Sequence, residues 1–305
     1  MPNILNSNGE SIFSPKHLSN SRVEMYERCP MQTFFRYELG WKTPSTAMLV
    51  RGAAAHAAIE HILKRQMAGT PIKIDEAFDV FSLAFEQEYD KSEFEIGEEE
   101  KLPKVKEVTY HAISDFLIKR AHQIQPESVE KSFEIPIEGT EYTYAGFIDL
   151  VDLASGVPEI VDFKTKNAFK KELEHDADVS EQLTSYSFVY KHNTGIVPRV
   201  AHEIIVVKKD TDFIRLNRAR DNTQRAVWYA NVKMIAYAIE NAIYYRGHKN
   251  VWHCSPKWCG WFDYCLNERP LPQKIRNMGI DRLPQDMIEL QKMVKELRKD
   301  KNDRR

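Results

Sequence analysis

Residues 146–166 have the sequence GFIDLVDLASGVPEIVDFKTK, and this stretch decides the fold. Its two short apolar runs, 147–151 and 159–164, are separated by a Ser-Gly turn, which is typical of a β-hairpin. Because side chains alternate across a strand, Asp162 and Lys164 are expected on one face of the second strand, about 7 Å apart. Asp149 comes from the neighbouring strand and is expected to reach the same face.

These charges admit two interpretations. An aspartate among Ile, Val and Leu has to be paired, hydrogen-bonded or bound to a metal, because an isolated buried carboxylate is too costly. Two such aspartates indicate a hard cation such as Mg²⁺ between them, and a nearby lysine can stabilise developing charge or position a water molecule. The hairpin alone equally permits a cross-strand Asp-Lys pair on a half-exposed sheet.

The composition indicates a globular protein without a membrane partner. The 305 residues are 42% hydrophobic, which is enough for the core of one large domain or two small ones. The sequence has no run of 18 apolar residues and no basic-then-apolar start, so we expect a cytoplasmic location, in the host if a phage encodes the protein. Since the net charge is −2, a nucleic-acid partner would need a local basic surface.

Upstream of the hairpin, the pattern predicts a short helix over 18–37 that is broken at Pro30, a helix over 51–65, and a charged helical region over 75–125. His56 lies among small residues that permit close approach of another backbone, although a helix histidine is more often structural than catalytic. Residues 129–137 alternate as a strand. In that strand Glu134 either adds a carboxylate to the site or faces outward.

Downstream of the hairpin, we expect a polar loop over 167–178, a helix over 180–192, a strand over 201–209 and a long helix over 223–245. Gln182 and Tyr186 are four residues apart and share a helix face, where they either hold a nucleotide or the lysine, or belong to the core. The approach to the long helix supplies the best candidates for contacts with a phosphate backbone, namely Arg215, Arg218, Arg220 and Arg225.

The cysteine spacing indicates a metal site. Cys254, Cys259 and Cys265 fall within twelve residues of one another, whereas Cys29 lies far upstream, beside Pro30. In a reducing compartment this pattern favours metal ligation over disulfides. Cys29 alone would be interpreted as a buried free cysteine.

Taken in order, six motifs resemble those of a known family. They are a Cys-Pro near the N-terminus, Gly-x-x-x-His, Gly-x-x-Asp, Asp-x-Lys, Gln-x-x-x-Tyr and a three-cysteine cluster. The set resembles the RecB-like nucleases of the PD-(D/E)xK superfamily, in the iron-sulfur branch that includes CRISPR-associated exonucleases and the AddB-type nuclease domain. The resemblance runs from about residue 20 to 266. It implies an α/β, restriction-endonuclease-like core: a central mixed sheet flanked by helices, with a helical insertion and a terminal region held by an iron-sulfur cluster.

The resemblance also implies a domain organisation: a flexible N-terminus over 1–17, a nuclease domain over 18–265 and a charged tail over 266–305. Within the nuclease domain, 66–128 would be the helical insertion, and Cys29 with residues 252–265 would form the cluster-binding region. The terminal cluster of the branch is expected to be structural and to aid DNA binding.

Site residues follow from the same resemblance. His56, Asp149, Asp162 and the backbone carbonyl of Phe163 would ligate Mg²⁺ or Mn²⁺, and Lys164 would be the catalytic lysine. Gln182 and Tyr186 would support that lysine and contact DNA. A [4Fe-4S] cluster would be held by Cys29, Cys254, Cys259 and Cys265. The Cys-x4-Cys spacing is wider than the Cys-x2-Cys of the branch, so zinc is the alternative at this site.

The function expected from these residues is hydrolysis of DNA phosphodiester bonds from single- or double-stranded ends, in phage or microbial recombination, repair or replication. A single-strand-binding or recombination protein is the expected type of protein partner. One alternative is a DNA-end-binding module with a structural iron-sulfur or zinc site and no turnover. Another is a zinc-stabilised regulatory protein in which the hairpin charges form surface pairs.

Overall fold

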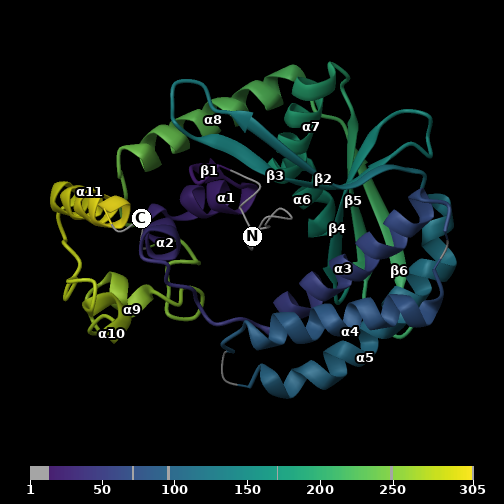
Figure 1. Ribbon diagram of the computed structural model, residues 1–305, viewed down its shortest axis with the longest axis horizontal. Helices are drawn as coiled ribbons and strands as arrows, with labels where there is room; N and C mark the ends of the chain where they lie inside the picture. The colour runs from purple at the N-terminus through teal and green to yellow at the C-terminus, as the bar shows by residue number, and fades with distance from the viewer. Residues whose placement is uncertain (1–13, 71, 95–96, 170, 248–249, 304–305) are drawn as a thin grey trace. The chain divides into compact units, whose positions relative to one another are not determined.

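A computed structural model describes residues 14–70, 72–94, 97–169, 171–247 and 250–303 of the chain (Figure 1). The chain divides into two compact units. Unit 1 comprises 1–43, 134–145 and 230–305, and unit 2 comprises 44–133 and 146–229. Residues 1–13 of the predicted N-terminal segment lie outside the described residues, whereas His17 and Leu18 form a strand. None of the described helices has the length and apolar character needed to cross a membrane.

The strands form one mixed sheet in the order β1-β3-β4-β5-β6, and β2 pairs with β3. Their bounds are His17–Leu18 (β1), Pro126–Pro136 (β2), Thr143–Asp152 (β3), Glu159–Lys166 (β4), Arg199–Val206 (β5) and Asp212–Arg218 (β6). β4 is antiparallel to β3 and parallel to β5, and β5 is antiparallel to β6. The predicted hairpin is therefore the β3–β4 pair, and the predicted mixed α/β architecture is confirmed.

In unit 2, three long helices lie along one side of the sheet strands (Figure 1): α3 (Ala47–Met67), α4 (Ile74–Asp90) and α5 (Leu102–Asp115). Short segments continue from them, namely η2 (Glu99–Lys101), η3 (Phe116–Arg120) and η4 (Ala121–Gln123). The next two helices are α6 (Glu172–Val179) and α7 (Glu181–Thr194). The predicted helical region 66–128 thus contains α4 and α5.

Unit 1 contains α1 (Asn20–Arg28), α2 (Pro30–Thr33), η1 (Phe34–Glu38), α9 (Phe262–Cys265), α10 (Gln273–Arg276) and α11 (Met287–Asp303); α8 (Asn222–Glu240) begins in unit 2 and ends in unit 1. The predicted helix break at Pro30 is confirmed, since Cys29 ends α1 and Pro30 begins α2. The charged region beyond 266 also contributes to a core, because Leu290 and Val294 of α11 are buried. Arg298 of α11 anchors this helix through a bidentate pair with the buried carboxylate of Glu38.

Two predicted elements differ from the structure. The segment 167–178 was expected to be a loop, but α6 forms from Glu172, with acidic Glu172 and Glu174 in its first turn, where they complement the helix dipole. The arginine-rich approach to α8 is strand β6, which pairs with β5 along its whole length. The apolar-polar alternation typical of a strand is absent from β6, because charged residues occupy positions on both faces of the strand.

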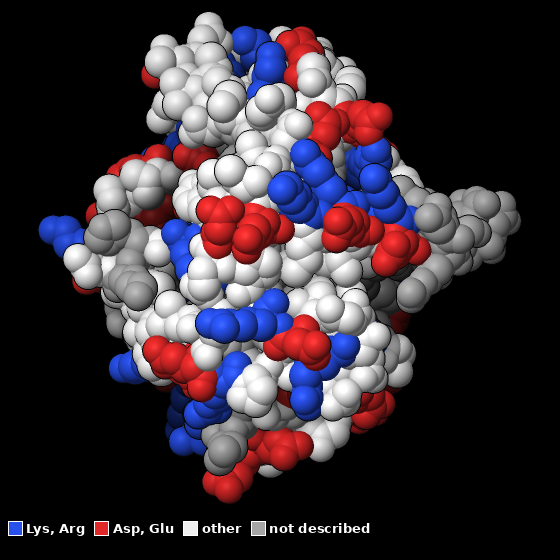
Figure 2. Space-filling model, turned by 90° about the vertical axis from the view of Figure 1, so that its left-hand side faces the viewer, with Lys and Arg blue, Asp and Glu red and all other residues white. Residues whose placement is uncertain are grey.

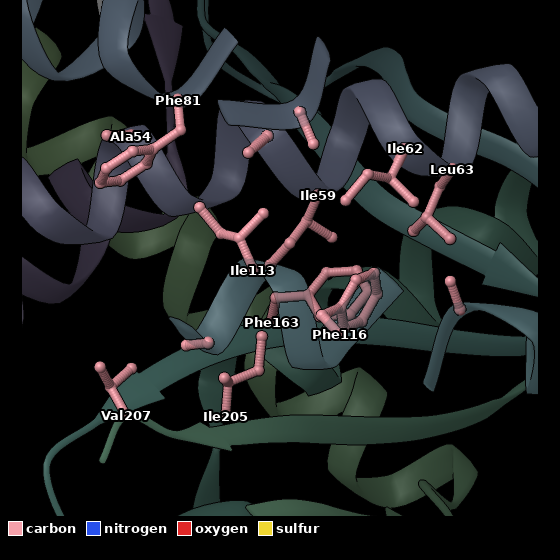
Figure 3. Close-up of a cluster of buried hydrophobic side chains, with 14 of the residues drawn as sticks. Ala54, Ile59, Ile62, Leu63, Phe81, Ile113, Phe116, Phe163, Ile205 and Val207 are labelled. Carbon is pink, nitrogen blue, oxygen red and sulfur yellow. The ribbon is translucent and has the colours of Figure 1, made fainter. Parts of the chain in front are cut away.

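The core of unit 2 lies between α3, α4 and α5 and the sheet, as Figure 3 shows. Phe163 of β4 points into this core, where its ring meets Phe116 edge to face with 5.9 Å between centroids. Phe116 also contacts Phe213 of β6, at 6.0 Å. Since side chains alternate along β4, the burial of Phe163 directs Asp162 and Lys164 to the opposite face of the sheet.

We predict that Phe116→Ala lowers the free energy of unfolding by about 3–5 kcal/mol, because the ring is fully buried and its removal leaves a cavity. Urea denaturation followed by circular dichroism measures this change. Leu83→Ala is the matched control: Leu83 lies in α4 but is 58% exposed, so its loss should shift stability by less than about 1 kcal/mol. Equal effects of the two substitutions would contradict the assigned core.

Candidate functional site

Strand β4 fixes the spacing of the central charged pair. Asp162 lies opposite His202 of β5, and Lys164 lies opposite Ile204, in a parallel register that extends over the whole of β4. Backbone hydrogen bonds on both sides hold the strand, so the two side chains are anchored on a rigid element. Asp162 is buried, and Lys164 is partly exposed.

Lys164 forms an ion pair with Asp162 and a hydrogen bond with Gln182. Its Nζ lies 2.8 Å from Oδ2 of Asp162 and donates to Oε1 of Gln182 at 2.7 Å. The amide Nε2 of Gln182 donates in turn to the hydroxyl of Tyr186 at 3.0 Å. The structure therefore brings these four predicted residues together, and the i, i+4 spacing on α7 is what aligns Gln182 with Tyr186.

The start of α7 explains why Gln182 reaches the lysine. Ser180 has extended backbone and caps the helix by accepting from the N–H of Leu183 at 3.2 Å. Leu183, Tyr186 and Tyr190 are buried, as their spacing predicts. The cap fixes the first turn, and with it the amide that orients Lys164.

A second group of ligand atoms lies at the β3 side of the site. Among the residues that the structure describes, His56, Glu130 and Asp149 are the one set of at least three His, Cys, Asp or Glu whose ligand atoms all lie within 4.8 Å of one another. His56 Nδ1 is 3.6 Å from Oδ2 of Asp149, which also accepts from the backbone N–H of Phe163 at 3.1 Å. An imidazole and two carboxylates suit a divalent cation.

Helix α3 is tied to β4 close to this group. The Arg51 guanidinium is buried, with Nη2 3.3 Å from the carbonyl of Thr165 and Nη1 bonded to Oδ1 of Asn167. Gly52 follows, and a Cβ at that position would lie 3.8 Å from Oγ1 of Thr165, in ordinary contact. These bonds fix the position of α3 along β4. They thereby also fix the position of His56, which lies five residues after Arg51 on the same helix.

Glu130 was missed by the sequence analysis. The alternation of apolar and polar residues in β2 had indicated Glu134 as a possible carboxylate of the site. In the structure its carboxylate accepts hydrogen bonds from the backbone N–H of Ser14 and from Oγ1 of Thr143. Glu130 has a φ of 49°, the left-handed region, which is uncommon for a residue other than glycine. Such a distortion within a strand re-aims a side chain, and here the carboxylate meets His56 and Asp149. No pattern in a single sequence marks this backbone conformation.

The gathered carboxylates disfavour their own ionisation. Burial, together with the neighbouring Asp162, raises the pKa of Asp149 to about 6. Burial, together with Asp149, raises the pKa of Glu130 to about 8. A site in which burial and like charges raise carboxyl pKa values is one where a cation would be strongly favoured.

Asp162 has a different set of neighbours from the His56 group. Besides Lys164, its Oδ2 lies 3.7 Å from Nε2 of His202, a buried histidine whose pKa is lowered by burial. His202 Nε2 also lies 3.4 Å from Oγ of Ser180. Two of the predicted metal ligands, His56 and Asp149, belong to the compact group, together with Glu130, which was not predicted. Asp162, the third predicted side-chain ligand, is paired with Lys164 instead.

Three of the four arginines expected to contact phosphates are engaged inside unit 2, so the structure corrects that expectation for Arg215, Arg220 and Arg225. Arg220 and Arg225 are buried. Arg220 donates to Thr184 Oγ1 and the Ala177 carbonyl, and Arg225 donates to Ser187 Oγ. Their role is to join α6, α7 and the start of α8.

Arg215 is the centre of an ionic network. It pairs with Glu203 at 2.6 Å, with Asp152 at 2.6 Å and with Glu159 at 3.0 Å. Arg120 forms a bidentate pair with Glu203, and Arg199 lies 3.5 Å from Glu159, so three guanidinium groups face the three carboxylates. Arg218 is more accessible and pairs with Asp178. A guanidinium held by three carboxylates neutralises them and is not presented to a phosphate.

The four cysteines converge in unit 1. A pocket is lined by Cys29, Cys254, Cys259 and Cys265, with apolar walls that include Phe35 and Phe262. Gln32 Nε2 lies 3.5 Å from Sγ of Cys259. Burial raises the pKa of Cys265 to about 11, and it also raises that of Cys259. Without a cation, these buried sulfurs would therefore remain thiols, and a bound metal would supply the charge that stabilises thiolates.

The sulfur spacing bears on the type of metal. In the part of the chain that the structure describes, no three cysteine sulfurs lie within 4.8 Å of one another. Thiolates that share one tetrahedral zinc at about 2.3 Å would be about 3.8 Å apart. Thiolates that each bind a separate iron of a cluster stand farther apart. Four cysteines on one apolar-lined pocket are a donor set that either zinc or an iron-sulfur cluster uses.

A family model described as the PD-(D/E)XK nuclease superfamily matches residues 17–266. The chain belongs to this superfamily. Its members generally use divalent metals, and a nuclease acts on nucleic acid. No curated protein matches the sequence. The chain is similar to the crystal structure of a presumed exonuclease from Eubacterium rectale, with 12% identity, 87% of this chain and 94% of that chain covered, and a TM-score of 0.49. It is also similar to a protein named SSO0001, with 13% identity, 82% and 86% covered, and a TM-score of 0.38.

We predict that Glu130→Gln stabilises the metal-free protein at pH 9 but not at pH 4. A raised carboxyl pKa means that the folded state binds the proton more tightly than the unfolded chain. Stability is therefore lost as pH rises from about 4 through the folded pKa of about 8. Thermal unfolding in EDTA at both pH values measures the effect, with the exposed Glu107→Gln as control. A pH-independent difference would contradict the prediction.

Proposed function

We propose that the chain is a divalent-metal-dependent deoxyribonuclease that hydrolyses phosphodiester bonds from DNA ends. The observation that carries the proposal is the position of Lys164, between Asp162 and Gln182 and on the strand that follows Asp149. The preference for ends and the role in recombination, repair or replication rest on the resemblance of the six motifs to the RecB-like branch.

His56, Glu130 and Asp149 would hold Mg²⁺ or Mn²⁺, with Asp162 and the carbonyl of Phe163 as further candidate ligands. The cation, when bound, would polarise the phosphate and lower the pKa of a water molecule. Asp162 and Gln182 orient the Lys164 ammonium, which is then available to stabilise charge that develops on the phosphate or to position the attacking water. Tyr186 fixes the amide of Gln182, so that its carbonyl oxygen faces the lysine.

We predict that Lys164→Ala lowers the cleavage rate by at least about 10²-fold, because the substitution removes the cation that neutralises transition-state charge. The assay is a time course on single- and double-stranded DNA labelled separately at each end, with Mg²⁺, Mn²⁺ or EDTA. Lys166→Ala is the matched control: Lys166 lies two residues farther along β4 and is exposed. Asp149→Asn should also abolish cleavage.

The assay separates the competing functions. Progressive shortening from one labelled end supports an exonuclease, whereas internal cuts support an endonuclease. Metal-independent binding of ends without any cleavage by the wild-type protein would support the non-catalytic end-binding module. Full activity of Lys164→Ala would refute the proposed mechanism.

We further propose that the four cysteines hold a [4Fe-4S] cluster that stabilises unit 1. Protein purified without oxygen should be brown and should contain about four iron and four sulfide per chain. Cys259→Ser should lose the iron and lower the thermal midpoint, while Ser255→Ala, in the same turn, should keep both. Colourless protein with one zinc per chain would overturn the cluster assignment.

A further inference from the structure

Two tryptophans of unit 1 are exposed to an unusual degree. Trp252 is 70% and Trp258 58% exposed, whereas Trp228 and Trp261 are buried at 2% and 5%. The rings of Trp252 and Trp258 lie edge to face, with 5.5 Å between centroids and an interplanar angle of 88°. Leaving two large aromatic surfaces in water is unfavourable, and such patches commonly mark a binding surface.

The backbone beneath these rings is tightly wound. Trp258 N donates to Ser255 O at 3.1 Å, and the hydroxyl of Ser255 donates to the carbonyl of Trp252 at 3.1 Å. Cys254 and Cys259 lie in the same turns, with further bonds from Cys254 N to Val251 O and from Cys259 N to Ser255 O. The backbone of both tryptophans is therefore held in the turns that carry Cys254 and Cys259. Because this backbone is already ordered, binding a ligand at the two rings costs little conformational entropy.

A lysine and a histidine lie against the pair. Lys257 Nζ lies 5.0 Å from the ring centroid of Trp258. His253 packs against Trp252 at 5.4 Å, and its Nε2 lies 3.1 Å from the carbonyl of Arg28, whose residue is exposed. Exposed aromatic faces beside a lysine form a combination that binds single-stranded nucleic acid, in which bases stack on the rings and a phosphate meets the cation.

We propose that Trp252 and Trp258 form a stacking surface for the bases of single-stranded DNA, with Lys257 beside the phosphates. The choice of DNA as occupant rests on the proposed function. Figure 2 shows basic and acidic side chains interspersed across the side of the molecule where α9, α10 and α11 lie. Since the net charge is only −2 and the charges alternate, stacking supplies the main attraction. Every base offers an aromatic face, so the surface is indifferent to sequence.

The experiment measures binding of fluorescent oligo(dT) by anisotropy in EDTA, which excludes cleavage. The double substitution Trp252→Ala with Trp258→Ala should weaken binding by about 10-fold or more, because stacking contributes about 1–3 kcal/mol per base. Trp252→Phe with Trp258→Phe should retain most of the affinity. Tyr237→Ala, which removes an aromatic ring of α8 that is 52% exposed, is the control and should change nothing.

Two readouts distinguish stacking from a structural role. An oligonucleotide without bases should bind the wild-type protein about 10-fold or more weakly than oligo(dT) does, a comparison that needs no mutant to fold. Lys257→Ala should lower the slope of log affinity against log salt by about one, whereas the tryptophan substitutions should leave the slope unchanged.

The outcomes separate this inference from the proposed function. Unchanged binding by the alanine double variant, or equal binding of the abasic strand, overturns the stacking surface even when the wild type cleaves DNA. Stacking-dependent binding of oligo(dT) by a wild-type protein that never cleaves DNA overturns the nuclease proposal alone. A wild-type dimer that dissociates in the double variant, without any binding of oligo(dT), would assign the tryptophans to a second copy of the chain and overturn the inference.

Discussion

The pairing of β4 with its two neighbours is the constraint on which the site depends. Backbone hydrogen bonds to β3 and β5 fix the strand, and the ring of Phe163 in the core fixes which face each side chain takes. A shift of one residue would bury Lys164 among apolar side chains and expose Phe163. The same register of β4 therefore buries Phe163 in the core and places Asp162 and Lys164 at the site. A change that weakens this register would lower the stability of unit 2 and displace the site residues together.

The site also contains charges that the fold alone does not compensate. Glu130 and Asp149 face one another with His56 as a weakly compensating neighbour, and both carboxyl pKa values are raised. Elsewhere in unit 2, buried carboxylates have dedicated cations, as Glu203 has Arg215 and Arg120. The contrast is informative, because the acidic cluster around Arg215 is paired with guanidinium groups of the protein, whereas the group of Glu130 and Asp149 is where the proposed divalent cation would bind.

Local pattern predicted the hairpin, the break at Pro30 and the shared helix face of Gln182 and Tyr186, because each depends on residues near in sequence. Arg215, Arg220 and Arg225 are engaged inside unit 2 for a long-range reason. Nothing near Arg215 in the sequence indicates that Asp152, Glu159 and Glu203 will surround it. Glu130 was missed because its place depends on a positive φ that a side-chain pattern does not encode. The cysteine spacing suggested a shared site, and convergence of the four residues on one pocket is a property of the fold.

The residues of the cysteine pocket flank unit 2 in the sequence. Cys29 precedes unit 2, whereas Cys254, Cys259 and Cys265 follow it. During synthesis, every residue of unit 2 leaves the ribosome before the last three cysteines do. The core of unit 2 can therefore begin to fold before the three cysteines that share a pocket with Cys29 have been synthesised. Completion of the pocket, and with it of the cluster that we propose it holds, is therefore a late event in the biogenesis of the chain.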